Sequence, residues 1–245
     1  MPEHLVYGLH AVRALLEKSP ETIKQLWMQK DRDDDKLKSL FKLATKCQLK
    51  VQLVPSKSLD KLLATRHQGV IAACVMKQAT THENDLPRLL EQCQGPPLLL
   101  VLDGVEDPHN LGACLRSADA AGVTAVLAPK DRAVGITPVV RKVACGAAEH
   151  VPFIQVTNLA RSLTQLKAQG IWLYGAAGEA EQTLYQCDFG GPIAIIMGAE
   201  GKGLRRLTRE TCDYLMRIPM RGSVASLNVS VATGICLFEV GRQRQ

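Results

Sequence analysis

The chain of 245 residues is long enough for one large or two medium-sized domains, and 46% of its residues are hydrophobic against 22% charged. Apolar residues recur in every segment, which excludes a largely disordered chain. The longest apolar runs, 96–102 and 191–198, are too short to cross a bilayer, and the N-terminus has no signal-peptide pattern. We therefore expect a cytoplasmic protein with no membrane partner.

The formal net charge of +6 is compatible with an RNA or phosphate partner but does not establish one. Aromatic residues make up only 4% of the chain, too few for a base-stacking sheet of the RRM type. The eight cysteines are scattered, with no CxxC pair among them. We expect free thiols, most of them buried, rather than a disulfide framework.

Hydrophobic periodicity in residues 1–76 predicts alternating helices and strands. The first helix begins at Leu9 and is ended by Pro20, and a strand follows at 23–28. The second helix has Leu37, Leu40, Phe41 and Ala44 on its apolar face and is followed by a strand at 50–54. The third helix is capped by Ser56 and runs to Ala64, and the last strand is 70–75. The acidic run 31–35 is predicted to be a solvated loop at the next helix N-terminus rather than a metal site.

Periodicity vanishes from Met76 to Asn84, and this polar stretch is the predicted linker. With a short helix near 85–93 it forms a connection, 77–95, between a domain at 1–76 and a second domain at 96–245. Near-continuous apolar strands alternate with helices in the second domain, which is typical of a parallel α/β sheet covered on both faces. The predicted strands are 98–103, 124–128, 153–156, 171–176, 192–197 and 214–218, and the predicted helices are 110–121, 138–146, 158–168, 203–211 and 228–240.

Three stretches beside these strands are too rich in Gly, Asn and charge to be ordinary connections. The first is 103–122, DGVEDPHNLGACLRSADAAG, in which Asn110 can cap a helix and Arg116 follows six residues later. Taken alone, Arg116 is as compatible with an ordinary surface arginine as with a functional one.

The second stretch is 195–204, IIMGAEGKGL, a buried strand that runs into a glycine-rich turn. Its GxxGxG spacing differs from the Rossmann fingerprint, and the residues around Lys202 do not complete a Walker A loop, so a nucleotide-dependent oxidoreductase is disfavoured. What remains is a backbone brought close to a ligand at the carboxyl end of a strand. Glu200 is either a ligand-facing carboxylate or a helix N-terminal acid.

The third stretch is 218–234, IPMRGSVASLNVSVATG, which contains a strand end, a loop and a helix start that holds Ser226 and Asn228. These two residues can be simple helix caps. A loop of this length beside a parallel sheet, however, is usually kept for binding.

Together these stretches form the arrangement D-x-x-x-D-P-x-N-x-G-x-x-x-R-x-A-x-x-x-G at 103–122, M-G-x-E-G-x-G at 197–203 and I-P-M-x-G-x-x-x-S-L-N-V-S-V-A at 218–232. This arrangement resembles the SpoU (TrmH-like) family of RNA ribose 2′-O-methyltransferases, and the resemblance covers the whole chain. The opening YGLHAVRALLE and the element His67-Gln68-Gly69 resemble the family's L30e-like RNA-binding domain. Detail in the first motif is most similar to members that methylate a guanosine ribose of bacterial 23S rRNA.

The resemblance implies a C-terminal trefoil-knotted (SPOUT) parallel-sheet domain, with the last helix after Asn228 threaded through the preceding loop, and a smaller N-terminal α/β L30e-like domain. It also implies S-adenosylmethionine as the methyl donor and a homodimer with the active site near the subunit interface. No metal is expected, because the sulfonium supplies its own leaving group. The cofactor residues implied by the resemblance are Gly198, Ile218 and Leu227, with Ala199 and Met220 as further contacts.

By the same resemblance, Arg116 is the catalytic arginine, and the polar residues around it are Asn110, Glu200, Ser226 and Asn228. A guanidinium stays protonated, so binding a phosphate or stabilising the 2′ alkoxide is physically easier for Arg116 than acting as a general base. The proton acceptor stays open among a substrate phosphate oxygen, water and Arg116 itself. Candidate RNA contacts in the first domain are Arg13, Lys57 and Arg66.

The leading hypothesis is S-adenosylmethionine-dependent 2′-O-methylation of a guanosine in 23S rRNA, with the P loop of the peptidyl-transferase centre as the expected target. A tRNA ribose methyltransferase is one alternative. The other is a non-catalytic RNA-binding protein of ribosome assembly, which is disfavoured because the polar motif residues are intact.

Overall fold

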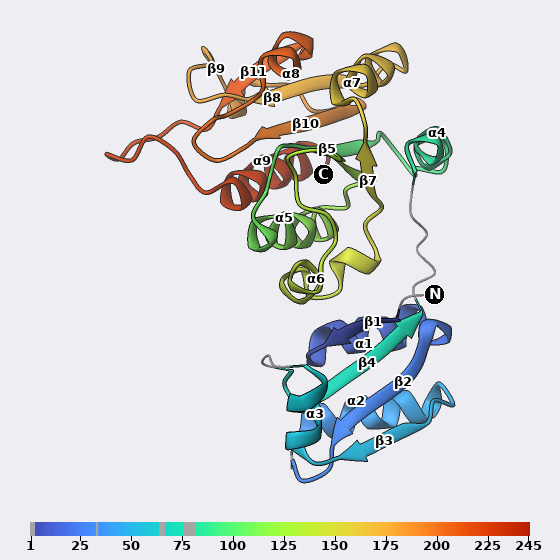
Figure 1. The fold of residues 1–245 in the computed structure, drawn as a ribbon. Coiled ribbons are helices and arrows are strands. Elements are labelled where there is room, and N and C mark those ends of the chain that lie inside the picture. Colours follow the sequence, from blue (N-terminus) through green and yellow to red (C-terminus); the bar gives the residue numbers. More distant parts are fainter. Residues whose placement is uncertain (1–2, 33, 64–66, 76–81) are drawn as a thin grey trace.

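The computed structural model describes residues 3–32, 34–63, 67–75 and 82–245, which form two separate sheets, each with its own helices (Figure 1). The N-terminal sheet has the strand order β1-β4-β2-β3. Its centre, β4 (Val70–Val75), pairs antiparallel with β1 (Glu3–Tyr7) and with β2 (Ile23–Gln29), and β2 pairs parallel with β3 (Val51–Val54). This mixed pairing makes the first unit an α/β domain with short connections.

Three helices cover the N-terminal sheet: α1 (Leu9–Lys18), α2 (Asp35–Lys46) and α3 (Ser56–Leu62). The apolar stripes of α1 and α2 are buried against one face, and Leu59 of α3 packs with Tyr7 and Ile71 on the other. Asp34 caps α2 by accepting a hydrogen bond from the Lys36 amide, as the acidic run predicts.

The structure corrects three details of the first domain. The strand β1 is absent from the predicted elements, because it passes into α1 through Gly8 alone (φ +93°) and leaves no turn signal. Pro55, and not Ser56, occupies the cap position of α3, which ends at Leu62; Ala64 lies outside the described residues. Phe41 is 39% exposed, because the buried stripe of α2 consists of Leu37, Leu40 and Ala44.

The second sheet has seven strands in the order β7-β6-β5-β10-β8-β11-β9, all parallel, which confirms the predicted α/β architecture. The strands are β5 (Leu98–Asp103), β6 (Ala125–Pro129), β7 (Phe153–Val156), β8 (Trp172–Ala176), β9 (Gln182–Thr183), β10 (Ile193–Gly198) and β11 (Tyr214–Arg217). The helices are α4 (Leu86–Glu91), α5 (Pro108–Ala120), α6 (Pro138–Ala144), α7 (Leu159–Ala168), α8 (Arg206–Thr211) and α9 (Val229–Gln243). Of these elements, only the two-residue β9 has no predicted counterpart.

Alternate residues of the fully buried β5 enter two different cores. Leu98, Leu100 and Leu102 pack under α5 and α9, whereas Leu99 and Val101 pack under α4 and α7. Apolar side chains on both faces are what a parallel sheet between two helical layers requires.

The end of the chain is tied to the starts of two central strands. The Arg244 guanidinium donates hydrogen bonds of 2.6 to 3.4 Å to the carbonyls of Pro96, Pro97, Phe189 and Gly191. These bonds hold the carboxyl end of α9 beside β5 and β10.

The two domains contact each other through α6 and the turn that follows it. The Lys142 ammonium lies 5.4 Å from the centre of the Tyr7 ring. Gly146 approaches α1 so closely that a Cβ there would lie 2.6 Å from the Cβ of Ala14. Among the described residues, no helix combines the length and apolarity needed to span a bilayer.

Candidate active site at the carboxyl ends of the parallel strands

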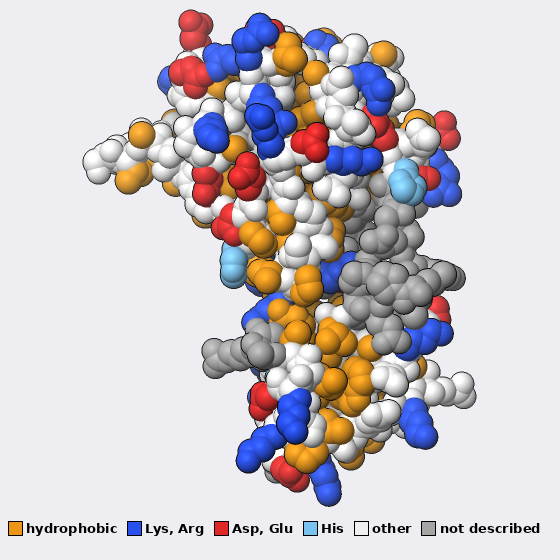
Figure 2. Space-filling view, viewed as in Figure 1, with side chains coloured by type: hydrophobic (Ala, Val, Ile, Leu, Met, Phe, Trp, Pro, Cys, Tyr) orange, Lys and Arg blue, Asp and Glu red, His pale blue; other side chains and the backbone are white. Residues whose placement is uncertain are grey.

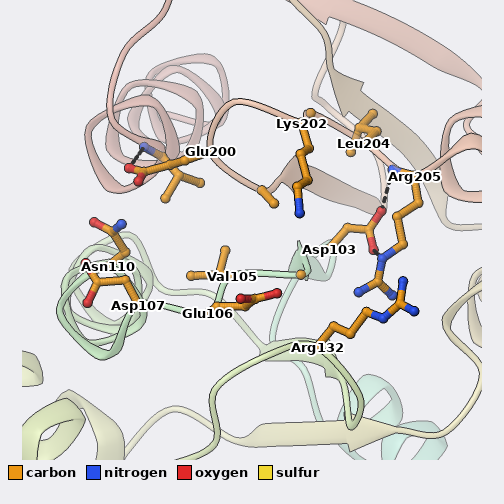
Figure 3. Close-up of a pocket in the computed structure, with 14 residues that line it drawn as sticks. Asp103, Val105, Glu106, Asp107, Asn110, Arg132, Glu200, Lys202, Leu204 and Arg205 are labelled. Carbon is orange, nitrogen blue, oxygen red and sulfur yellow. Dashed lines mark hydrogen bonds and ion pairs between the residues drawn. The ribbon is translucent and has the colours of Figure 1, made fainter.

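Two of the predicted motifs meet because their strands are neighbours. In the pairing of β5 with β10, Asp103 lies opposite Gly198, so both chains leave the sheet at the same point. A cavity of about 410 Å³ opens there (Figure 3). The lining side chains come from the segment after β5, from the turn after β10, from Arg132 and from Val229 at the start of α9.

The turn after β10 is built on close backbone approach. Ala199 and Gly203 exchange backbone hydrogen bonds of 3.2 and 2.9 Å. A Cβ on Gly198 would lie 2.2 Å from the Gly203 carbonyl carbon, so position 198 has no room for a side chain. Gly201 and Gly203 have φ of +72° and +65°, which glycine adopts without strain. The close approach at this turn is between two backbone segments, and the approach to a ligand stays a prediction.

All three motifs meet at the side chain of Asn228. Its Nδ2 donates to Asn110 Oδ1 at 2.9 Å and to Glu200 Oε1 at 2.7 Å. Its Oδ1 accepts from the Ser230 amide at 2.9 Å, which makes Asn228 the N-cap of α9. Glu200 also accepts from the Val229 amide at 3.4 Å. One capping residue thus joins segments about 120 and 30 residues away in the chain.

Asn110 is buried in the first turn of α5. The prediction that it caps this helix is wrong. Asp107 takes that role, because its carboxylate accepts a hydrogen bond from the His109 amide at 2.9 Å. The Asn110 side chain is thereby left to face Asn228. Burial raises the pKa of Cys114, on the same helix, to about 11, so this thiol stays protonated at neutral pH and is no nucleophile.

Arg116 lies outside the cavity of the same chain. Six residues after Asn110, it points from a different side of α5, where it is exposed. Its Nη1 lies 3.8 Å from Cys145 Sγ, at the left-handed end of α6. The structure therefore brings Asn110, Glu200 and Asn228 together but does not bring Arg116 to them.

The predicted cofactor residues fall into two groups at the same edge of the sheet. Gly198 and Ala199 belong to the turn after β10, and Ala199 lines the cavity. The second group lies in the segment 218–228 between β11 and α9, which projects from the domain (Figure 1). Within that segment Met220 and Ser226 are exposed, Leu227 is half-buried and Ile218 packs against the core. β11 lies two strand spacings, about 10 Å, from β10.

The cavity also contains charged residues to which sequence reasoning assigns no role: Asp103, Glu106, Asp107, Arg132, Lys202 and Arg205. Four of them lie within the quoted motifs, so motif membership could have identified them. Arg132 and Arg205 carry no such signal, because they reach the cavity only through the folding of the loops after β6 and β10.

Two family models match the chain: the SpoU rRNA Methylase family at residues 97–238, and RNA 2′-O ribose methyltransferase substrate binding at residues 5–80. The 23S rRNA (guanosine-2′-O-)-methyltransferase RlmB of Pseudomonas putida is 56% identical over 240 residues, which cover 98% of this chain and 96% of the relative.

Two solved structures share the architecture. A crystal structure of an RNA 2′-O ribose methyltransferase is 28% identical, has a TM-score of 0.80, and covers 99% of this chain and 89% of its own. The SpoU methyltransferase AviRb from Streptomyces viridochromogenes, in complex with AdoMet, is 24% identical with a TM-score of 0.79 and covers 99% of this chain and 90% of its own. At that identity the likeness to AviRb concerns the fold alone.

The SpoU family model spans more than half of the chain. The Pseudomonas putida protein and this chain match over nearly the full length of both. The chain belongs to the SpoU rRNA methylase family.

Proposed function

We propose that this protein transfers the methyl group of S-adenosylmethionine to the 2′-oxygen of a guanosine ribose in 23S rRNA. The observation that carries the proposal is the Asn228 amide, which joins Asn110 and Glu200 beside a cavity at the strand ends. The relatives named for this activity and the match to a substrate-binding domain support the choice of substrate.

The residues at this edge fit S-adenosylmethionine. The turn at 198–203 offers backbone groups with no side chain at position 198, and Ile218, Met220 and Leu227 offer apolar surface for the adenine. When bound, the cofactor supplies the methyl group and leaves as a neutral thioether, so the reaction needs no metal.

The protein side of the reaction consists of orientation and charge stabilisation. Asn228 bonds Oδ1 of Asn110 and Oε1 of Glu200, so the Asn110 amide nitrogen and the second Glu200 oxygen remain for the ribose hydroxyl. Arg116 carries a permanent charge suited to the developing 2′ alkoxide. Ser226 is exposed and lies two residues before Asn228 in the chain. We propose that it contacts the bound substrate.

We propose a homodimer whose interface lies in the C-terminal domain. Val231 and Phe238 on α9 are 51% and 57% exposed, whereas Leu237 and Val240 on the same helix are fully buried. Phe238 also lines a hollow, together with Ala120, Ala121, Leu237, Gly241, Arg242 and Gln245. A second copy on this surface would cover these side chains and place the partner's active site near Arg116, which explains why Arg116 lies outside the cavity of its own chain.

We also propose a trefoil knot, in which the last helix after Asn228 threads through the preceding loop. The proposed location is the cytoplasm, and the proposed target is the P loop of the peptidyl-transferase centre. We further propose a first domain at 1–76, a connection at 77–95 and a second domain at 96–245. Lys and Arg side chains lie on the surface of both domains (Figure 2). In the N-terminal domain, Lys57 is exposed, and we propose it as an RNA contact. Arg13 is proposed as well, although it donates to Ser39 and lies 3.9 Å from Glu17. Arg66 lies outside the described residues.

Ribose-methylation mapping of rRNA and tRNA from a strain that lacks the gene tests the function. We expect one guanosine of 23S rRNA to lose its methyl group and to regain it with the wild-type gene but not with Arg116→Ala. Loss of a tRNA methyl group instead would identify a tRNA enzyme. Full rescue of ribosome assembly by Arg116→Ala without methylation would identify a non-catalytic assembly protein. A thermal shift with S-adenosylmethionine but none with NAD excludes the oxidoreductase.

A further inference from the structure

One wall of the cavity is basic. Arg132 and Arg205 lie side by side there, on the side away from Asn110 and Glu200, and the Lys202 side chain points into the cavity between the two walls (Figure 3). Within the part of the chain that the structure describes, Arg132 and Lys202 make no hydrogen bond or ion pair. Two unpaired cations in one cavity indicate an anionic ligand.

Arg205 is held in place by a buried carboxylate. Asp103 is fully buried at the end of β5, where its Oδ2 accepts a hydrogen bond from the Arg205 amide at 2.9 Å. Among the described residues its Oδ1 has no hydrogen-bond partner, and it lies 3.5 Å from Arg205 Nε. Gly104 (φ +89°) allows this packing, since a Cβ there would lie 3.1 Å from Arg205 Nη2. The guanidinium is thus fixed against the backbone with its charge offset by Asp103.

Arg132 is presented by a strained backbone. Its φ of +54° is left-handed, a conformation that is unfavourable for a non-glycine residue. Its loop is tied to the first motif by a hydrogen bond of 2.9 Å from the Val134 amide to the Val105 carbonyl. Strain of this kind persists where the surrounding structure imposes it, and it concentrates at ligand sites.

We infer that Arg132, Lys202 and Arg205 bind a phosphate of the RNA backbone next to the target ribose. This inference rests on the proposed function. The opposite wall, with Asn110, Asn228 and Glu200, takes the ribose, so a nucleotide spans the cavity with its phosphate on the basic side. The volume of about 410 Å³ is in the range of small-ligand sites.

The other charges in the cavity select a phosphodiester over a free nucleotide. Glu106, Asp107 and Glu200 line the same space, and they would repel the three or more charges of a nucleoside triphosphate. A phosphodiester carries a single charge and continues out of the cavity as a chain. The site therefore matches a polynucleotide strand, and the phosphate contact need not be made by Arg116.

The test uses the full-length protein and a transcribed 23S rRNA fragment that contains the peptidyl-transferase P loop. Arg132→Gln and Lys202→Gln remove charge with little change in size, and Arg132→Lys and Lys202→Arg retain it. We expect each Gln variant to raise the Kd for RNA about threefold or more and to lower the slope of log Kd against log salt concentration by about 0.7. The charge-retaining variants should keep the wild-type slope, and affinity for S-adenosylmethionine should not change.

Arg206→Gln is the matched control, because Arg206 begins α8 next to Arg205, pairs with Glu210 and does not line the cavity. Its salt slope should equal that of the wild type. The inference is overturned if both Gln variants keep the wild-type slope, or if they lose S-adenosylmethionine instead of RNA. Methylation of the fragment by the wild type is measured in the same assay, so failure of the proposed function would be seen separately.

Discussion

Asn228 shows how much one side chain contributes to this molecule. Its carbonyl oxygen begins α9, and its amide nitrogen joins Asn110 to Glu200. Helix capping is a local task that serine, aspartate and asparagine all perform. Of these three capping residues, only asparagine carries an NH2 group whose two hydrogens can bridge two acceptors, so the two tasks can be separated by substitution.

Asn228→Ser should keep the cap but lose both bridging hydrogen bonds. We expect turnover to fall at least about tenfold, or about 1.4 kcal/mol in activation free energy, while the Tm changes by less than about 2 °C. Asn158→Ser is the control, because Asn158 caps α7 by accepting from the Arg161 amide and lies away from the cavity. Equal turnover in the two variants would contradict a role for the bridge.

Arg116→Ala tests the catalytic arginine. If its charge stabilises the alkoxide, turnover should fall at least about a hundredfold, or about 2.7 kcal/mol, with S-adenosylmethionine affinity nearly unchanged. Arg116→Lys should rescue little if the planar fork matters. Single-turnover kinetics and calorimetric titration measure the two quantities. A collapse of cofactor binding in Arg116→Ala would move the catalytic role to another residue.

At the scale of elements, the position of α5 depends on how closely α6 packs against it. A Cβ on Gly112 would lie 2.7 Å from the Val143 Cβ and 2.9 Å from the Val140 carbonyl oxygen. The second of these atoms is backbone and has little freedom to move. Because Asn110 and Asp107 belong to the same helix, a shift of α5 would also disturb the cavity.

Gly112→Ala should therefore destabilise the fold by about 1 to 3 kcal/mol through overpacking. At about 2 to 4 °C per kcal/mol, the Tm should fall by roughly 2 to 12 °C in a thermal melt. The control is Gly178→Ala, where a Cβ would meet open space and the backbone is not left-handed. If Gly112→Ala and Gly178→Ala had the same Tm, the close packing of α5 against α6 would not contribute to the stability of the fold.

At the scale of the whole molecule, the contact between the domains contains a titratable group. Burial lowers the pKa of His150, and Lys18 of the first domain lowers it further, while Asp119 and Glu17 act in the opposite direction. The unfolded chain therefore binds a proton at higher pH than the native one. The stability that neutral His150 contributes is present above its ordinary pKa of 6.5 and is lost as the pH falls below it.

His150→Gln should reduce the loss of stability between pH 7 and pH 5.5. Thermal or urea denaturation at a series of pH values measures this dependence. Parallel curves for wild type and His150→Gln would contradict the assignment.

The proposed dimer makes a separate prediction about the exposed face of α9. The wild type should sediment as a dimer at micromolar concentration. Val231→Lys and Phe238→Lys should shift it toward monomer, because each would place a charge in an apolar contact. Leu53→Lys is the control, since Leu53 is 52% exposed on β3 of the first domain. A monomeric wild type would count against the interface.

The sequence by itself determined the local structure and the chemistry of the motifs. Parallel α/β architecture followed from continuous apolar strands such as Leu98–Asp103, and the close turn after Gly198 followed from its glycines. These features depend on neighbouring residues and on burial patterns, which a linear sequence records. The motif spacing likewise indicated the family to which the chain belongs.

Only the tertiary structure decided which motif residues meet. Asn110 and Asn228 are 118 residues apart, and their hydrogen bond exists because β5 and β10 are neighbours and α9 begins beside them. The same arrangement brought Arg132 and Arg205 to the cavity and left Arg116 outside it. Strand order and loop path are long-range properties, set by the packing of whole elements, so periodicity and spacing carry no record of them.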